Sequence, residues 1–371
     1  MLGLSPDAER GVDAQSQTEP AEPQSPASWR RRAQRPMLLG ALVLLPIAAF
    51  LLNGAVRDYI ASSALDSRAA RNAGLPSTPD AGFDLSGLVI PDEEIRRGGP
   101  RKDGIPALTD PKMIAANDAA YLSGEDKVIG VAFGGEVRAY PLKILDFHEI
   151  VNDSVGGRPV AVTYCPLCDS SVVFDRRDGE RTLEFGVSGL LYNSNVLMFD
   201  RGNPGEEALW SQMRGGGVSG WASEHSLRKL PMEVTTWNAW QERHPETLVL
   251  SADTGHERRY DRSVYAHYFS RDSLMFEVSP SSDRLPPKTP VLCVSYNGVS
   301  RAYVIEKLLD QALERQEIGG KGFDLAPDPA ARTLRIENAE PGVEWCYSFW
   351  FAWYAFHPDT EVVPNPLSDE P

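Results

Sequence analysis

The chain has 371 residues, of which 42% are hydrophobic and 24% are charged. This length exceeds what one hydrophobic core usually serves, so we expect two or three compact units with tails and exclude a single small domain. The 37 basic and 52 acidic residues give a formal net charge of −15, which would repel a phosphate backbone, so no nucleic-acid partner is expected. Four cysteines are too few for a disulfide-stapled scaffold.

The amino end is predicted to be disordered and to lead into a membrane segment. Residues 1–35 are rich in Ala, Gln, Glu, Ser and Pro and lack an aliphatic cluster. Residues 36–56 are apolar on every face and long enough to cross a hydrocarbon core of about 30 Å. Four arginines at 30–32 and 35 precede this segment, and a single arginine, Arg57, follows it. The positive-inside rule therefore keeps the amino end in the cytoplasm.

The membrane is therefore an expected partner of this chain. We predict a single-pass protein of the inner (cytoplasmic) membrane, with its bulk in the periplasm or outside the cell. Two alternatives stay open. The small residues at 61–64 suit signal peptidase, so the segment is either a retained anchor or a cleaved signal. The adjacent arginines at 30–32 also permit twin-arginine export of a folded protein.

The exported part is predicted to be mainly β with a few helices, an α+β class. Residues 57–100 are expected to form a tether, whose apolar island at 85–90 docks on the folded part. Beyond it, short runs of aliphatic and aromatic residues alternate with Gly, Asp and Asn breaks, which is typical of strands. These runs are residues 128–133, 159–164, 171–175, 182–187 and 195–200.

The sequence contains an internal repeat. Residues 128–145 realign with 291–308, and residues 237–250 realign with 350–363, with the shorter match of 181–185 to 332–336 between them. We therefore predict two pseudo-symmetric β-rich lobes that arose by duplication. The first, at 101–288, is longer and is expected to carry the chemistry; the second, at 289–363, is reduced, and a disordered tail follows from 364.

Two residue types in the repeat are assigned structural roles. Trp237 and Trp240, like Trp350 and Trp353, lie one helical turn apart and are expected to be core residues. A histidine precedes a proline at positions 244 and 357, where a helix must end, so both histidines are interpreted as turn residues.

The stretch 146–175 is the one most suited to chemistry, because it combines His148 with Cys165 and Cys168. Three functions fit. The two cysteines form a thiol–disulfide couple; or Cys165, Cys168 and His148 hold a soft metal, copper or zinc; or Cys165 is a nucleophile activated by His148, with Asp153 or Asn152 orienting the ring. The structural alternative is a disulfide or two buried thiols in a tight turn.

A second polar cluster is predicted to line a substrate cleft beside Cys165. The cluster contains Ser188, Tyr192, Asn193 and Asn195, and Tyr164, which directly precedes Cys165, is expected to line the same cleft. The alternative is that these Asn and Ser residues, with Ser194, only form the turn between two strands.

Several stretches together resemble an exported bacterial and archaeal family known as domain of unknown function 3179. They are residues 104–112, 138–145, 147–153, 163–176, 185–195, 248–255 and 284–288. The resemblance runs from about residue 98 to 363, and its hallmarks are the HEIVND and YCPL stretches at 148–153 and 164–167. It implies an exported protein with no established activity. Many family members have Thr at the position of Cys168, so the resemblance favours Cys165 with His148.

The leading hypothesis is a membrane-anchored extracytoplasmic protein whose Cys165 and His148 bind copper or carry out thiol chemistry. One alternative is a non-catalytic envelope module that binds a partner protein or a glycan and has a structural Cys165–Cys168 disulfide. Another is a Cys–His hydrolase of envelope polymers. The sequence leaves open whether the protein is an enzyme.

Overall fold

The computed structural model describes residues 82–364, which all belong to one compact unit. The predicted disordered amino end, the membrane segment 36–56 and the cleavage alternative at 61–64 lie outside the described residues, as does the tail after residue 364. Among residues 82–364, no helix combines the length and the apolar character that crossing a membrane requires. Strands dominate and helices are short, which confirms the mainly β, α+β class.

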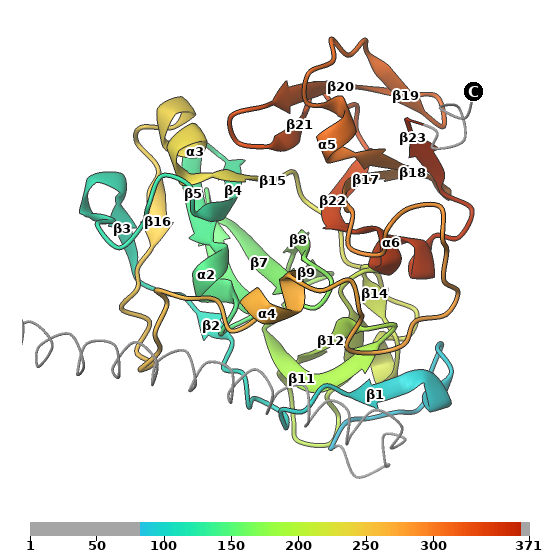
Figure 1. The fold of residues 1–371 in the computed structure, drawn as a ribbon. Coiled ribbons are helices and arrows are strands. Elements are labelled where there is room, and N and C mark those ends of the chain that lie inside the picture. The colour runs from blue at the N-terminus through green and yellow to red at the C-terminus, as the bar shows by residue number, and fades with distance from the viewer. Residues whose placement is uncertain (1–81, 365–371) are drawn as a thin grey trace, which may run out of the picture. The chain divides into compact units, whose positions relative to one another are not determined.

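Most strands belong to three sheets (Figure 1). The first has the order β15-β4-β5-β16-β3, with β3 Met113–Ala115, β4 Lys127–Phe133, β5 Glu136–Pro141, β15 Glu233–Thr236 and β16 Leu248–Leu250. The second has the order β2-β6-β7-β8-β22-β17-β18-β23, with β2 Leu108–Thr109, β6 Ile150–Val155, β7 Arg158–Cys165, β8 Ser170–Asp175, β17 Pro290–Tyr296, β18 Val299–Val304, β22 Glu344–Phe349 and β23 Glu361–Val363. The third has the order β1-β11-β12-β13-β14, with β1 Ile95–Arg97, β11 Phe185–Tyr192, β12 Asn195–Asp200, β13 Leu209–Ser211 and β14 Gly216–Gly217.

Two small sheets and short helices complete the described part of the chain. The small sheets contain β9 Arg177–Asp178 with β10 Arg181–Thr182, and β19 Gln316–Ile318 with β20 Lys321–Asp328 and β21 Thr333–Glu337. The α-helices are α2 Leu142–Leu145, α3 Trp237–Arg243, α4 Ala266–Phe269, α5 Ile305–Leu308 and α6 Trp350–Phe356. Short 3-10 turns occur at Asp92–Glu94, Ala116–Asp118 and Gly220–Ala222.

Four strands of the first sheet and four of the second are connected in the same way. The antiparallel hairpin β4–β5 leads into α2, and the hairpin β17–β18 leads into α5. Later in each set, an antiparallel neighbour (β15 or β22) leads into a longer helix (α3 or α6). A strand parallel to the second hairpin strand (β16 or β23) follows. These two sets coincide with the stretches that repeat in the sequence.

The repeated tryptophans are core residues, as predicted. Trp237, Trp240, Trp350 and Trp353 are at most 5% exposed. The second indole of each pair donates its Nε1 hydrogen to a threonine hydroxyl, Thr247 or Thr360, at 2.9 Å in both copies. His244 and His357 end α3 and α6 and pack their rings on the same indoles, which confirms their interpretation as turn residues.

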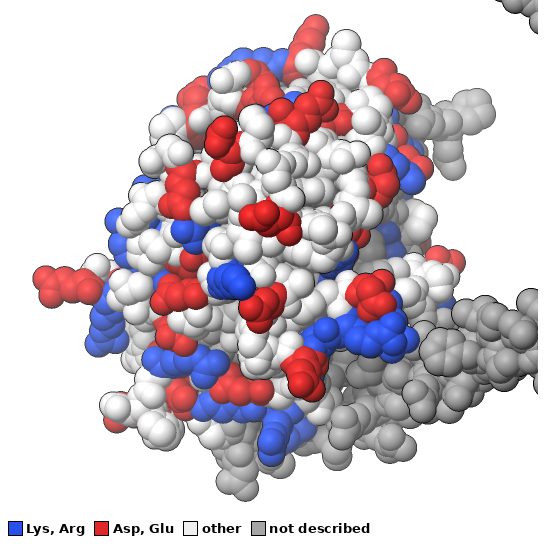
Figure 2. All heavy atoms as spheres, turned by 90° about the vertical axis from the view of Figure 1, so that its left-hand side faces the viewer, with Lys and Arg blue, Asp and Glu red and all other residues white. Residues whose placement is uncertain are grey.

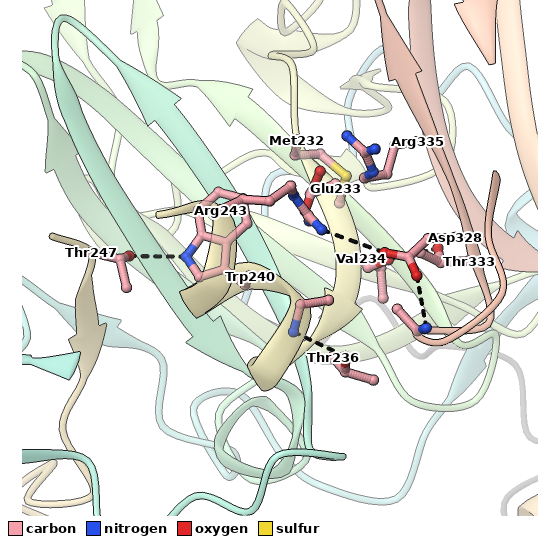
Figure 3. A network of polar contacts seen from close by, with 12 residues as sticks. Met232, Glu233, Val234, Thr236, Trp240, Arg243, Thr247, Asp328, Thr333 and Arg335 are labelled. Atoms are coloured by element: carbon pink, nitrogen blue, oxygen red, sulfur yellow. Dashed lines mark hydrogen bonds and ion pairs between the residues drawn. The ribbon is translucent and has the colours of Figure 1, made fainter. Parts of the chain in front are cut away.

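A polar network joins α3 and β15 to the β20–β21 hairpin (Figure 3). Arg243 forms an ion pair with Glu233 and another, at 3.4 Å, with Asp328. The hydroxyl of Thr333 donates to the carbonyl oxygen of Val234 at 2.7 Å. Because these groups come from stretches about 90 residues apart, they tie the two repeat copies together in addition to the β8–β22 pairing.

One predicted strand is divided in two. Residues 182–187 were expected as a single strand, but β10 ends at Thr182 and β11 begins at Phe185. Between them, Leu183 donates to the Arg176 carbonyl at 2.8 Å and accepts from the Arg176 guanidinium at 2.7 Å. The Asn152 amide then bonds both the N–H and the carbonyl of Phe185. These contacts use the backbone groups that a continuous ladder would pair.

The end of the predicted tether packs on the third sheet. Phe83 and Ile90 are buried against that sheet, and Ile95 of β1 pairs with Tyr192 of β11. Val89, within the island expected to dock, is 44% exposed. On the face that includes β3, β16 and α3, acidic and basic side chains are interspersed (Figure 2). That face therefore has no extended patch of one charge.

Candidate thiol site

Cys165 and Cys168 lie together at the turn of the β7–β8 hairpin. Cys165 is the last residue of β7, residues 166–169 form the loop, and the Cys168 N–H donates to the Cys165 carbonyl at 3.1 Å. The two residues are 2% and 0% exposed, and both are free thiols. The Cys-x-x-Cys segment thus connects two strands, as its flanking sequence indicates. Its cysteines are two buried thiols in a turn, which is one form of the structural alternative, and they do not form the disulfide that is its other form.

The two thiols differ in acid strength because of how they contact each other. Burial alone would raise the Cys165 pKa, but hydrogen bonds from the Cys168 thiol and from the backbone N–H groups of Cys168, Val196 and Leu167 lower it below its ordinary value. The pKa of Cys168 is raised well above its ordinary value by burial and by its hydrogen bond to the Cys165 sulfur. Of the two thiols, Cys165 is therefore the one that ionises more readily.

A tight turn between β11 and β12 closes over the two sulfurs. Its residues Asn193 and Ser194 have φ values of 48° and 64°, the left-handed conformation of a two-residue hairpin turn. The Ser194 carbonyl oxygen lies 3.3 Å from Cys168 Sγ and 3.8 Å from Cys165 Sγ. The Asn193 amide holds the turn in place through the backbone N–H and carbonyl of Ser279.

Ser194 belongs to the polar cluster that the sequence places beside Cys165 or in the turn between two strands. Its hydroxyl oxygen is buried and has no hydrogen-bond partner among residues 82–364. A buried hydroxyl without a partner costs free energy, about 1–3 kcal/mol, unless a ligand or water satisfies it. Its carbonyl contact with both cysteines, which the sequence did not indicate, distinguishes Ser194 from the neighbouring turn residues.

A cavity of about 280 Å³ lies near the thiol pair, and its lining residues do not include either cysteine. Leu167 and Val196, whose N–H groups lower the pKa of Cys165, contribute to its lining. Further apolar lining comes from Ile105, Phe147, Val187, Leu190, Leu191, Val264 and Met275, and the polar lining comes from Asp146, Glu149, Arg258 and Tyr265. The cavity therefore suits a small, largely uncharged molecule.

A β-bulge shapes one wall of this cavity. The pairing of β11 with β12 shifts between Val187 and Leu190, where the Ser188 hydroxyl donates to the Leu197 carbonyl and accepts from the Leu190 N–H at 2.9 Å. Gly189 has a φ of 79°, and a Cβ atom there would approach the Pro100 carbonyl oxygen to 2.3 Å. Only glycine therefore lets the segment at 98–104 lie against the bulge and complete the wall.

Two carboxyl groups in the cavity wall favour their neutral forms. Burial raises the pKa of Asp146 to about 7. Burial also raises the pKa of Glu149 well above its ordinary value, and the negative charges of Cys165 and Asp146 add to this shift. Glu149 has a φ of 56°, fixed by hydrogen bonds of its N–H to Leu145 and of its carbonyl to Tyr164. A non-glycine residue held in this conformation is typical of functional sites.

His148 is fully buried, and both of its ring nitrogens have partners. Its Nδ1 lies 2.7 Å from the Pro106 carbonyl oxygen, which accepts the ring proton, and its Nε2 lies 2.6 Å from the Tyr260 hydroxyl, which donates to it. Burial lowers the pKa of His148 to about 4. The Tyr260 hydroxyl also contacts the Thr254 hydroxyl at 2.7 Å. His148 thus holds two loops together as a neutral ring.

Asp153 and Asn152 have partners other than His148. The Asp153 carboxylate bonds the Arg138 guanidinium and the Tyr140 hydroxyl, each at 2.6 Å, and Asn152 bonds Phe185 as described above. The predicted catalytic set of Cys165, His148 and Asp153 is therefore not hydrogen-bonded together, because each residue has other partners.

The predicted metal site is not assembled either. Within residues 82–364, no three His, Cys, Asp or Glu side chains are grouped so that they could hold a metal ion, and this includes Cys165, Cys168 and His148.

The predicted cleft residues do not line the cavity. Asn195 donates to Ser170 and Gln212, and its side chain also influences the pKa of Cys168. Tyr164 donates to Asp169 at 2.8 Å, Asn193 anchors the turn, and Tyr192 packs its ring edge-on against Phe356. Glu149 belongs to the HEIVND stretch, but nothing in the sequence indicated that it lines the cavity.

The comparisons with known proteins give one match. Residues 102–342 match the model of a family described as "protein of unknown function (DUF3179)". No curated protein and no solved structure matches the chain.

Proposed function

We propose that this chain, which belongs to the DUF3179 family of proteins of unknown function, is a dithiol oxidoreductase whose working groups are Cys165 and Cys168. The observation that carries the proposal is a pair of free thiols at one turn, with both sulfurs beside the Ser194 carbonyl oxygen and with the pKa of Cys165 lowered and that of Cys168 raised. A nucleophilic thiolate with a second thiol in contact is the arrangement that thiol–disulfide exchange requires.

The substrate we propose is a small-molecule disulfide bound in the adjoining cavity. Both cysteines are almost fully buried, which does not suit the disulfide of a large folded partner. The cavity holds about 280 Å³ and has mostly apolar walls, so it fits a small molecule with little charge.

In the first step the Cys165 thiolate attacks one substrate sulfur. A bond forms between Cys165 Sγ and that sulfur, the substrate S–S bond breaks, and the other sulfur leaves with the electron pair. Glu149 supplies a proton to this leaving thiolate, because its raised pKa keeps the carboxyl group protonated beside the cavity.

In the second step Cys168 resolves the mixed disulfide. Once Cys165 is part of a mixed disulfide its negative charge is gone, and with it the contact that kept Cys168 protonated. Cys168 passes its proton to the Glu149 carboxylate and attacks Cys165 Sγ, and the second substrate sulfur leaves as a thiolate that takes its proton from water. The protein is oxidised by two electrons to the Cys165–Cys168 disulfide, and the substrate is reduced to two thiols.

The proposal is tested with an aromatic disulfide that releases a coloured thiolate, added to the full-length reduced protein. Wild type is expected to release both halves of the reagent, because Cys168 displaces the second half. Cys168→Ser is expected to release only one half and to keep the other as an adduct on Cys165, identified by mass spectrometry. Cys293→Ala is the matched control, since Cys293 is equally buried but lies in β17. An adduct that persists in wild type would refute the resolving role of Cys168.

Binding of copper(I) by the same two sulfurs is a second candidate function. The specific observation is that both sulfurs lie beside the Ser194 carbonyl, within 3.3 and 3.8 Å, so they are close to each other, and thiolates are preferred ligands of copper(I). The ligand set would be Cys165 and Cys168, because His148 uses both ring nitrogens elsewhere. Tight copper(I) binding in a competition titration, abolished by either serine variant, would favour this function.

Two wider features remain proposals. We propose that residues 36–56 anchor the protein in the inner membrane with residues 82–364 outside the cytoplasm; the apolar character of the segment and the preceding arginines support this. We also propose that the two copies arose by duplication, which is supported by the matching strand orders. Partner proteins, glycans and a Cys–His hydrolase activity stay predictions of the sequence.

A further inference from the structure

A second cavity, of about 420 Å³, lies at the end of the β17–β18 hairpin, away from the thiol pair. The hairpin closes with the two-residue turn Asn297–Gly298, whose φ values are 48° and 81°. The charged side chains that line the cavity are Arg214, Lys229 and Glu344, two cations and one carboxylate. This cavity is therefore locally positive in a chain whose formal net charge is −15.

Lys229 is the most unusual of these charges. Its side chain is only 7% exposed, and its ion-pair partner, Glu344 Oε2, is 3.8 Å from Nζ, which is beyond hydrogen-bond distance. Within residues 82–364 no hydrogen bond of the Lys229 ammonium group is found, although most of its side chain is buried. A ligand in the cavity would supply the acceptor.

His357 provides a second group without a partner in the same cavity. Its Nε2 is buried and has no hydrogen-bond partner among the described residues. The ring is stacked on Trp353, with centroids 3.7 Å apart, so its position is fixed. Burial and the nearby Lys229 charge lower the pKa of His357 to about 3, and the ring is therefore neutral.

The matching hairpin of the other repeat copy lacks the polar groups of this cavity. In the alignment of 128–145 with 291–308, Ser295, Tyr296 and Ser300 stand where the β4–β5 hairpin has Ala132, Phe133 and Val137. Ser295 and Ser300 are directly paired across the strands, as are Ala132 and Val137, so the two hydroxyls lie on one face. The fold itself thus does not require hydroxyl groups at these positions.

From these observations we infer that the cavity at the β17–β18 turn is a binding site for a small oxyanion, a carboxylate or a phosphate, with Lys229 as its charged anchor. The serine hydroxyls donate hydrogen bonds to the oxygens of the ligand. The exposed Arg214 adds a second positive charge at the opening. This site is independent of the dithiol function.

The test is calorimetric titration of the full-length protein with inorganic phosphate and, separately, with succinate, at constant ionic strength. We expect saturable binding of at least one probe, and the comparison of the two tells a phosphate ligand from a carboxylate ligand. Lys229→Met is expected to weaken binding at least about tenfold, because it removes a charge-assisted hydrogen bond. Ser295→Ala with Ser300→Val, the residues of the other hairpin, is expected to weaken it several-fold.

Lys112→Met is the matched control, because Lys112 is exposed, pairs with Asp253 and does not line the cavity. It is expected to bind the probes as wild type does. If Lys229→Met fails to fold, the double serine variant decides the question, since its replacements are tolerated in the β4–β5 hairpin. The inference is overturned if wild type binds neither probe, or if the folded variants bind with unchanged affinity.

Discussion

The thiol of Cys168 donates to the Ser194 carbonyl oxygen at 3.3 Å, and Cys165 Sγ lies 3.8 Å from the same oxygen. The pKa of Cys165 is lowered and that of Cys168 is raised well above its ordinary value, so two neighbouring buried thiols differ in acid strength. The predictions about the thiol site depend on this difference.

The first prediction concerns the reactivity of Cys165. Its rate of alkylation by iodoacetamide is expected to rise with pH through a midpoint below that of an ordinary cysteine, about 8.5. Cys168→Ala removes the thiol donor and is expected to raise this midpoint by about one pH unit, because a hydrogen bond to a charged group contributes about 1.5 kcal/mol. Mass spectrometry of the alkylated peptide measures the rate. An unchanged midpoint in Cys168→Ala would mean that the thiol contact does not set the Cys165 pKa.

The second prediction concerns Glu149. Replacing it with glutamine keeps the size of the side chain and removes the exchangeable proton. We expect Glu149→Gln to slow exchange with a small disulfide at neutral pH by about a hundredfold, the usual contribution of a general acid. The midpoint of Cys165 alkylation is expected to change little, because burial raises the pKa of Glu149 and favours its uncharged form. Stopped-flow kinetics measure the rate, and a rate equal to that of wild type would exclude Glu149 as the proton donor.

The third prediction concerns the pH dependence of stability. The pKa of Asp146 is raised from 3.8 to about 7 by burial, so the folded protein binds a proton that the unfolded chain releases. Its contribution is favourable below pH 4 and is lost as the pH rises to 7. Asp146→Asn is therefore expected to stabilise the protein at pH 8 relative to pH 4, by on the order of 2 kcal/mol. Urea unfolding at the two pH values measures this difference, and an equal effect at both would contradict the assignment.

The fourth prediction concerns the network between the repeat copies in Figure 3. Arg243 bonds Glu233 and Asp328, and all three side chains are at most 26% exposed. Arg243→Ala leaves two partly buried carboxylates without their partner and is expected to cost about 1–3 kcal/mol of unfolding free energy. Lys112→Ala, which removes an exposed ion pair, is expected to cost less than about 1 kcal/mol. Comparable costs for the two variants would show that the network does not hold the copies together.

Much of the fold was predictable because it depends on local patterns. The runs at 128–133, 159–164, 171–175 and 195–200 are strands, since aliphatic residues between turn-formers specify them whatever the neighbours. The division of 182–187 was not predictable, because it depends on Arg176 and Asn152, whose side chains reach that backbone only in the folded state.

The candidate site was predicted in part for the same reason. Cys165 and Cys168 are close in sequence, so their contact follows from the hairpin that holds them. The partner of His148 is Tyr260, which is 112 positions away, and the wall of the cavity depends on a bulge opposite Pro100. Such long-range contacts leave no local signal, so the place of Glu149 in the cavity wall and the contact of the Ser194 carbonyl with both sulfurs emerged only from the structure.

The central claim is that Cys165 and Cys168 interconvert between a dithiol and a disulfide in the folded protein. The most direct test is equilibration of the full-length protein with defined ratios of reduced and oxidised glutathione, followed by acid quenching, alkylation and mass spectrometry. The account predicts one two-electron transition to a Cys165–Cys168 disulfide, unaffected by Cys293→Ala and absent in Cys168→Ser. Free thiols at both positions under every ratio, or a disulfide that forms only in denaturant, would contradict it.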